Sequence, residues 1–157
     1  MIREAAIDDV PAIAALIRAL AEYERLAHEV ALEVDQLREQ LFGERRYAEV
    51  LIADEAREVV GFALYFHNFS TFLGQPGIYL EDLFVLPEHR GAGHGKALLA
   101  QLARIAVERG CGRLEWSVLD WNEPSIAFYR SLGARAMDDW TTYRLTGDKL
   151  AALATDG

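Results

Sequence analysis

The feature that most constrains this fold is an apolar segment that leads into a glycine-rich turn and then into a long helical pattern. The apolar segment covers residues 78–86, and the turn has glycine at every second position from Gly91 to Gly95. The first backbone N–H groups of a helix are unpaired and carry partial positive charge. Small residues there let a diphosphate approach the backbone. The sequence therefore predicts a pyrophosphate-binding turn, with added positive charge from Arg90 and Lys96.

Two other phosphate-binding motifs do not fit this turn. A Walker A loop requires Gly-x-x-x-x-Gly-Lys-Ser/Thr, whereas Arg90 stands at the first glycine position and Ala97 follows Lys96. Ala97 has no hydroxyl for magnesium. A dinucleotide-binding fingerprint requires Gly-x-Gly-x-x-Gly near the start of a βαβ unit, and this turn follows several earlier elements. The spacing therefore argues against both classes of nucleotide site.

Hydrophobic periodicity predicts strands and helices that interleave around one mixed sheet. We expect a first helix capped by Asp8. Because proline cannot donate to a sheet ladder, we expect the strand at 78–86 to lose its pairing at Pro87 and to leave a gap beside Leu83 to Val85. The expected strands cover 2–5, 47–53, 59–66, 78–86, 114–119 and 136–145, and further helices cover 34–42, 93–109 and 124–132.

Composition limits the number of domains and the partners. The 157 residues, 52% of them hydrophobic, fit a single domain over 1–157. The net charge of −9 disfavours nucleic-acid phosphates and favours cationic small molecules. A lone cysteine, Cys111, suits a reducing compartment. There is no apolar run of membrane-spanning length and no signal-like N-terminus, so we expect a cytoplasmic protein without membrane contact.

A second segment downstream carries a family resemblance. Residues 120–134 place Asn122 before a short helix and Tyr129 within it. Together with the Arg-Gly-x-Gly-x-Gly turn, this segment resembles the Gcn5-related N-acetyltransferases, and the similarity runs from Ile2 to about Leu145. Within that family the chain most resembles the diamine branch, which acetylates spermidine, spermine and thialysine, through the Glu81-Asp82 pair and residues 121–125 and 21–24.

The resemblance implies an α/β fold whose mixed, largely antiparallel twisted sheet is flanked by helices and splays between strands 78–86 and 114–119. It implies acetyl-CoA as co-substrate, with the pantetheine arm added beside the splayed strand. The cofactor contacts that it implies come from the strand end, the turn and the short helix: Leu83, Phe84, Val85, Arg90, Gly91, Ala92, Gly93, His94, Gly95, Lys96, Asn122, Glu123, Pro124 and Ser125. For Asn122, a simple helix cap is the alternative role.

Acetyl transfer to an amine requires that the amine lose a proton. An amine with a pKa of roughly 10.4 is neutral in only about one molecule in a few thousand at pH 7. The resemblance favours Glu81 as the base or amine anchor, acting through a water molecule; the alternative is a solvent-facing strand residue. Tyr129 is the candidate acid for the departing thiolate, and the alternative is a core aromatic beside Phe128. The four histidines have no close ligand spacing, so we expect no metal.

The resemblance also implies an acceptor site at Tyr23, Glu24, Glu81, Glu115, Trp116 and Ser117, in which a carboxylate attracts an ammonium and an aromatic ring adds a cation–π contact. The diamine branch carries an acidic pair near Thr141 that this chain lacks, although Asp138 and Asp139 lie slightly earlier. This departure favours lysine-like or thialysine-like amines over long polyamines.

We expect direct transfer in a homodimer that pairs through residues 140–145. The alternatives are acetylation of a protein or peptide, and a non-catalytic acyl-CoA-binding regulator.

Overall fold

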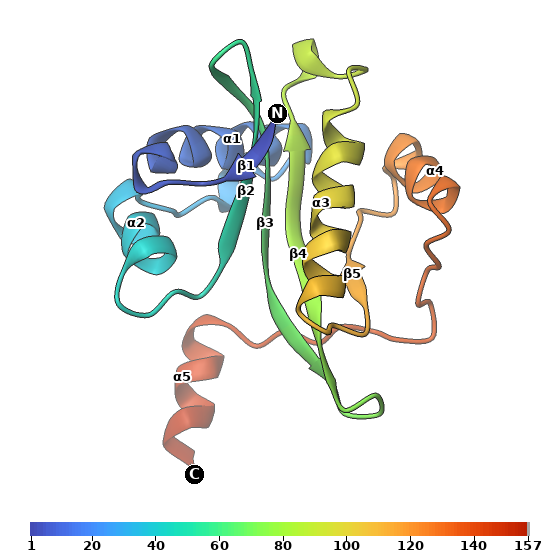
Figure 1. The fold of residues 1–157 in the computed structure, drawn as a ribbon. Helices are drawn as coiled ribbons and strands as arrows, with labels where there is room; N and C mark the ends of the chain where they lie inside the picture. Colours follow the sequence, from blue (N-terminus) through green and yellow to red (C-terminus); the bar gives the residue numbers. More distant parts are fainter. Residues whose placement is uncertain (157) are drawn as a thin grey trace. The chain divides into compact units, whose positions relative to one another are not determined.

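The computed structural model describes residues 1–156, which form two compact units, Met1–Leu119 and the segment from Asp120 onward (Figure 1). The second unit contains α4 (Glu123–Ser131) and α5 (Gly147–Asp156). The first unit contains β1 (Ile2–Glu4), η1 (Ile7–Asp9), α1 (Val10–Tyr23), η2 (Ala27–Glu29), α2 (Val34–Phe42), β2 (Glu49–Glu55), β3 (Glu58–Ser70), β4 (Gln75–Val85), η3 (Pro87–His89), α3 (His94–Glu108) and β5 (Leu114–Trp116), where η marks a short 3₁₀ helix.

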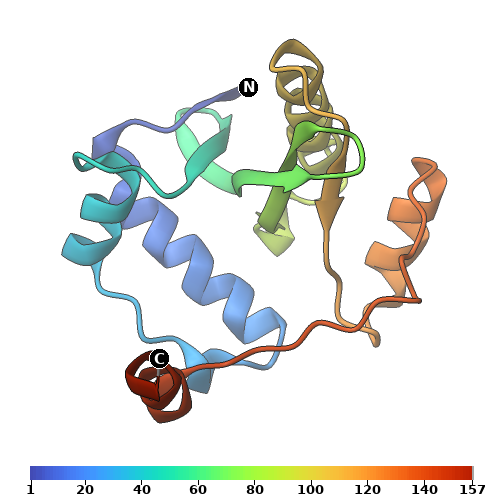
Figure 2. The ribbon, with the colours of Figure 1, turned by 90° about the horizontal axis from the view of Figure 1, so that it is seen from below.

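The strands of the first unit form one sheet in the order β1-β2-β3-β4-β5. All neighbours are antiparallel except β4 and β5, which are parallel. This arrangement confirms the predicted mixed, largely antiparallel sheet. Helices α1 and α2 lie on one face of the sheet, and α3 lies on the other (Figure 2).

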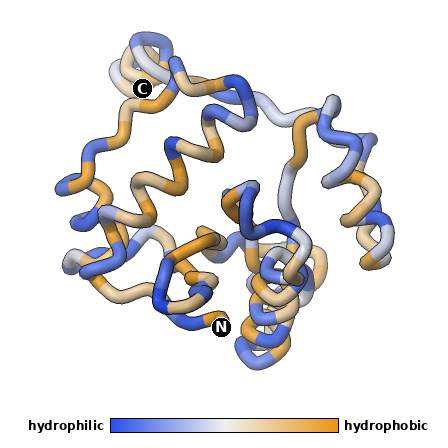
Figure 3. The backbone as a smooth tube through the Cα atoms, turned by 90° about the horizontal axis from the view of Figure 1, so that it is seen from above, coloured by the Kyte–Doolittle hydropathy of each residue, from blue (hydrophilic) through white to orange (hydrophobic). Residues whose placement is uncertain are grey.

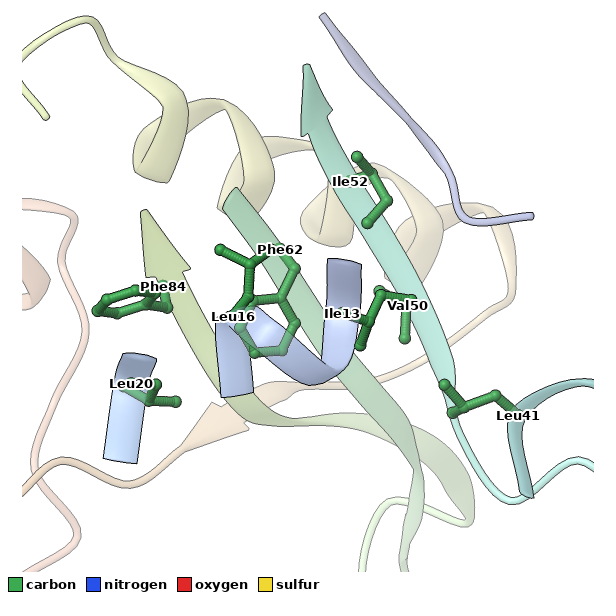
Figure 4. Close-up of a cluster of buried hydrophobic side chains, with 8 residues drawn as sticks. All are labelled: Ile13, Leu16, Leu20, Leu41, Val50, Ile52, Phe62 and Phe84. Carbon is green, nitrogen blue, oxygen red and sulfur yellow. The ribbon is translucent and has the colours of Figure 1, made fainter. Parts of the chain in front are cut away.

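A buried apolar cluster lies between the helices α1 and α2 and the sheet. Apolar residues recur along α1 at helical spacing, so the helix presents one hydrophobic stripe to the strands (Figure 3). These side chains interdigitate with those of β2, β3 and β4 (Figure 4). The cluster contains Ile13, Leu16, Leu20, Leu41, Val50, Ile52, Phe62 and Phe84. It fixes the end of α1 against the end of β4, where the candidate site begins.

The predicted splay between the fourth and fifth strands is present, but Pro87 does not cause it. Strand β4 pairs with β5 only from Ile78 to Leu80, whereas its pairing with β3 continues to Val85. The separation therefore begins well before Pro87, because β5 ends at Trp116. Pro87 instead starts η3, where its missing N–H costs no ladder hydrogen bond.

Other sequence predictions were wrong in detail. The strand expected over 136–145 is absent, and no strand follows Trp116 in the described residues; a strand forms only where a partner strand satisfies its backbone. Helix α5 was not predicted. Asp8 does not cap the first helix: the Asp9 carboxylate accepts a hydrogen bond from the Ala6 N–H at 2.7 Å, and η1 precedes α1. Within residues 1–156, no helix has the length and apolar character needed to cross a bilayer.

Candidate active site

The glycine-rich turn has the backbone conformation and the open space that a diphosphate requires. Gly91 and Gly93 both have φ of +87°, and Gly93 is the N-cap of α3. This left-handed region favours glycine, because a Cβ would press on the following carbonyl. A Cβ built at Gly91, Gly93 or Gly95 would meet no atom within 4 Å. A ligand could therefore approach the unpaired N–H groups at the start of α3 directly, and the turn fits the pyrophosphate of a coenzyme A molecule.

Arg90 faces the sheet as well as the turn. Its Nε donates a hydrogen bond to the Val85 carbonyl at 3.0 Å. Its guanidinium carbon lies 4.8 Å from the centre of the Tyr23 ring and 5.4 Å from that of Phe84. Arg90 was predicted to supply charge to a phosphate. In the structure it links the predicted cofactor turn to the end of α1, and Lys96 remains an exposed cation on α3.

The edge of β4 beyond Leu80 offers backbone groups to a ligand. Leu83, Phe84 and Val85 pair with β3 on one side only, and in the described structure no strand pairs with their other side. An extended amide chain could add to this edge as a further strand. The predicted pantetheine contacts at Leu83 to Val85 thus lie on an available sheet edge that leads into the glycine turn.

A β-bulge at Glu81 changes which acidic side chain faces α1. Leu64 pairs with Asp82 and Tyr65 pairs with Leu80, so Glu81 is an extra residue without a cross-strand partner. Paired residues project from the same face of a sheet. Asp82 therefore shares the α1 face with Leu64, and it is half-buried, whereas Glu81 is exposed. Simple alternation along the strand could not reveal this arrangement.

Glu24, Glu81 and Asp82 form an acidic cluster in which Asp82 is the most strongly perturbed. The pKa of Asp82 is raised to about 6, mainly by burial and also by the nearby negative charges of Glu81 and Glu24. Burial also raises the pKa of Glu24. Carboxylates that repel one another in a partly desolvated site gain most when a cation arrives. We call Glu24, Glu81 and Asp82 the acidic cluster.

The structure brings together only some of the predicted acceptor residues. Tyr23 packs with its ring centre 6.2 Å from that of Phe84, on the α1 face. The Glu115 carboxylate is already paired with Arg113, at 3.0 Å, and accepts a hydrogen bond from Asn68 at 3.1 Å. These contacts leave Glu115 less suited to hold a substrate ammonium than the acidic cluster.

The other two predicted residues, Trp116 at the end of β5 and Ser117 just after it, project to opposite sides of the sheet. The Ser117 hydroxyl lies 2.7 Å from the Tyr79 hydroxyl, and Tyr79 pairs with Glu115. Trp116 pairs instead with Leu80, and so belongs to the face that α3 covers.

In the second unit, Asn122 caps α4 as predicted. The Ser125 N–H donates to Asn122 Oδ1 at 3.4 Å, and Pro124 lies in the first turn, where proline is tolerated. The Tyr129 ring centre lies 5.7 Å from that of Phe128 on the same helix. The cap fixes the start of the helix that carries Tyr129. The catalytic role of Tyr129 stays a prediction.

The glycine turn and the segment with Asn122 and Tyr129 both lie within the match to one protein family. The profile of the acetyltransferase (GNAT) family matches residues 13–134, which include both the glycine turn and the segment with Asn122 and Tyr129. The chain belongs to this family. It is an N-acetyltransferase, and members of the family use acetyl-CoA as co-substrate.

The names of several relatives of this acetyltransferase describe enzymes that act on small amines. It is 38% identical to a thialysine N-epsilon-acetyltransferase of Bos taurus, over 98% of this chain and 96% of the relative. It is 34% identical to an L-ornithine N5-acetyltransferase of Arabidopsis thaliana, over 97% and 86%. Among solved structures, an integron cassette protein from the mobile metagenome of V. cholerae has a TM-score of 0.83 and 31% identity, over 98% of this chain and 96% of that one.

The resemblance favours Glu81 over its neighbour Asp82, whereas the bulge turns Asp82 toward the α1 face. The residue types around Glu81 do not predict this bulge. The described residues contain no His, Cys, Asp and Glu grouping suited to a metal ion.

Proposed function

We propose that this acetyltransferase moves the acetyl group of acetyl-CoA directly to the primary amine of a small cationic acceptor. The observation that carries the proposal is the acidic cluster on the α1 side of β4, next to a strand edge that leads into the glycine turn. An ammonium group is attracted to such a cluster, and Tyr23 adds an aromatic face. The names of the relatives favour lysine-like and ornithine-like amines over other acceptors.

The residues of the chain can each take one part of the reaction. Acetyl-CoA supplies an activated acyl group as a thioester. The glycine turn and Asn122 hold its phosphates and its amide-rich arm, so that the acetyl end lies by the acidic cluster. The amine nitrogen forms a bond to the acyl carbon, and the bond from that carbon to sulfur breaks. Glu81, through a water molecule, accepts the first proton, which the ammonium loses before the attack. The Tyr129 phenol donates a proton to sulfur and is reprotonated by the second proton that leaves nitrogen as the amide forms.

In this scheme, Asp82 and Glu24 bind the ammonium group of the acceptor. With a pKa of about 6, Asp82 is ionised at neutral pH and becomes protonated in mild acid. It therefore holds an ammonium well at pH 7 and poorly at pH 5. Asp138 and Asp139 are candidates for the acidic contact missing near Thr141, and a chain with weaker distal contacts favours short diamines and amino-acid side chains over long polyamines.

We also propose that the enzyme is a cytoplasmic homodimer. The segment predicted to pair across the interface carries Trp140, 79% exposed, and Tyr143, 94% exposed, and large aromatic surfaces of this kind are typical of interfaces. Light scattering at micromolar concentration should give twice the chain mass. A monomer would contradict this part of the proposal.

Replacement of Tyr129 by phenylalanine tests the catalytic assignment. We expect kcat to fall by about 100-fold, since a positioned proton donor contributes on that scale, with acetyl-CoA affinity within twofold of wild type. Tyr47→Phe, at an exposed tyrosine between α2 and β2, is the matched control and should leave turnover intact. Unchanged turnover in Tyr129→Phe would refute the proton-donor role. A wild-type protein that binds acetyl-CoA but never releases thiol would favour the regulator.

A further inference from the structure

The carboxylate of Glu55, in the β2–β3 hairpin, bridges one histidine before the glycine turn and one within it. His89 ends η3 just before the turn, and His94, between Gly93 and Gly95, is the first residue of α3. His89 Nδ1 lies 2.7 Å from Glu55 Oε2, and His94 Nε2 lies 3.3 Å from the same oxygen. Figure 1 shows the β2–β3 hairpin and this turn at the same end of the sheet. The reaction described above gives Glu55 no role.

The hairpin holds Glu55 in a defined place. Glu55 pairs with Glu58 across a two-residue turn in which Ala56 and Arg57 both have positive φ, 51° and 68°. Non-glycine residues adopt this conformation only where the surrounding structure enforces it. The preceding residue, Asp54, forms an ion pair with Arg3 in β1. The carboxylate therefore reaches the histidines from a constrained turn of the sheet.

The chemistry of the contact fixes the histidine tautomers. An ionised carboxylate only accepts hydrogen bonds, so His89 carries a hydrogen on Nδ1 and His94 carries one on Nε2. The contacts with His89 and then His94 hold the pKa of the Glu55 carboxyl below its ordinary value. Glu55 therefore stays ionised at neutral pH and keeps both acceptor contacts.

We propose that Glu55 is a positioning residue that closes the glycine turn between His89 and His94 into the shape that receives the coenzyme A pyrophosphate. The proposal rests on acetyl-CoA as the ligand of the proposed function. A turn whose glycines have open space around them has few contacts of its own, and ordering such a segment on binding reduces affinity. A contact that already holds the turn in place removes part of this ordering cost before acetyl-CoA binds. A carboxylate repels phosphate directly, so any favourable effect of Glu55 must act through the histidines.

The test compares Glu55→Gln with Glu58→Gln, its exposed cross-strand partner on the same turn. Calorimetry on the full chain measures acetyl-CoA affinity, and steady-state assays separate kcat from KM. We expect Glu55→Gln to weaken acetyl-CoA binding about two- to fivefold, the scale of exposed ion pairs, with kcat unchanged and Glu58→Gln like wild type. His94→Asn should give a similar loss, and the double variant should lose less than the two single losses combined.

Three results would overturn the proposal. Glu55→Gln could bind acetyl-CoA as wild type does. It could bind more tightly, which would mean that Glu55 only repels phosphate. It could lose kcat with affinity unchanged, which would place Glu55 in the chemical step. Failure of the proposed function is distinguishable, because then wild type itself would bind no acetyl-CoA. If Glu55→Gln does not fold, as judged by its thermal transition, His94→Asn alone carries the same affinity test.

Discussion

The two halves of the candidate site are built in different ways. The glycine turn is made by backbone: its φ values, the N-terminus of α3 and the open space around Gly91 and Gly93 come from consecutive residues. The acidic cluster is made by side chains from α1 and from a bulge in β4, which only the folded sheet brings together. Recognition by backbone depends on a short local segment, whereas recognition by side chains depends on tertiary placement. We therefore expect cofactor binding to be general in the family and acceptor choice to be particular to this chain.

The largest effect should come from a side chain placed in the turn. Gly93→Val adds a β-branched residue at φ of +87°, in the space that the pyrophosphate would occupy. We expect acetyl-CoA affinity to fall by about 100-fold, because a misplaced binding group can cost that much. Isothermal titration calorimetry measures the loss.

Gly74→Ala is the matched control for the turn. Gly74 also has positive φ, of +64°, and open space around it, but it lies in the β3–β4 connection. This variant should lose some stability for the same backbone reason and keep its acetyl-CoA affinity. Equal losses of affinity in the two variants would mean that strain, and not the position of the turn, explains the result.

A smaller effect, confined to the acceptor, should follow from Asp82→Asn. Loss of a partly buried carboxylate should raise KM for the amine by about 10- to 100-fold, and KM for acetyl-CoA should stay within about twofold. In wild type, amine KM should rise as pH falls through about 6, where Asp82 becomes protonated. Steady-state kinetics from pH 5 to pH 8 shows both effects. A pH-independent amine KM would contradict the role of Asp82.

Asp82→Asn, which should weaken amine binding, should make the folded protein more stable at high pH. The pKa of Asp82 is raised in the folded state, from 3.8 to about 6, so this carboxyl favours folding in acid, and that contribution is lost as pH rises through about 6. At pH 8, Asp82→Asn should be more stable than wild type, by up to about 3 kcal/mol. At pH 4 the difference should largely vanish. Denaturant titrations at the two pH values measure it, and an equal difference at both would contradict the burial of the charge.

The smallest effect should come from Glu24→Gln. Glu24 lies at the end of α1 and is less perturbed than Asp82, so we expect amine KM to rise only about three- to tenfold. Glu22→Gln, on an exposed position of the same helix, should behave as wild type. If the control raises amine KM as much as Glu24→Gln does, the general negative charge of the surface, and not the cluster, attracts the acceptor.

The sequence revealed the half of the site that is local. Glycine spacing located the turn, and the position of Asn122 before Pro124 predicted the cap that the structure shows. Predictions from the sequence were wrong for features that depend on pairing between distant segments. The bulge at Glu81 depends on the register of β3, and the missing strand at 136–145 depends on a partner that is absent from the described sheet. The contact of Glu55 with two histidines joins segments far apart in the chain, so spacing could not predict it.

The most direct test of the account is thiol release from acetyl-CoA with thialysine, ornithine, lysine, putrescine, spermidine, spermine and a few peptides as acceptors. The account predicts rapid turnover with at least one short amine or amino-acid side chain, slower turnover with spermine, and little with peptides. Thiol release with peptides alone would contradict the small-amine acceptor. Bound acetyl-CoA with no thiol release across the whole panel would contradict the proposed reaction.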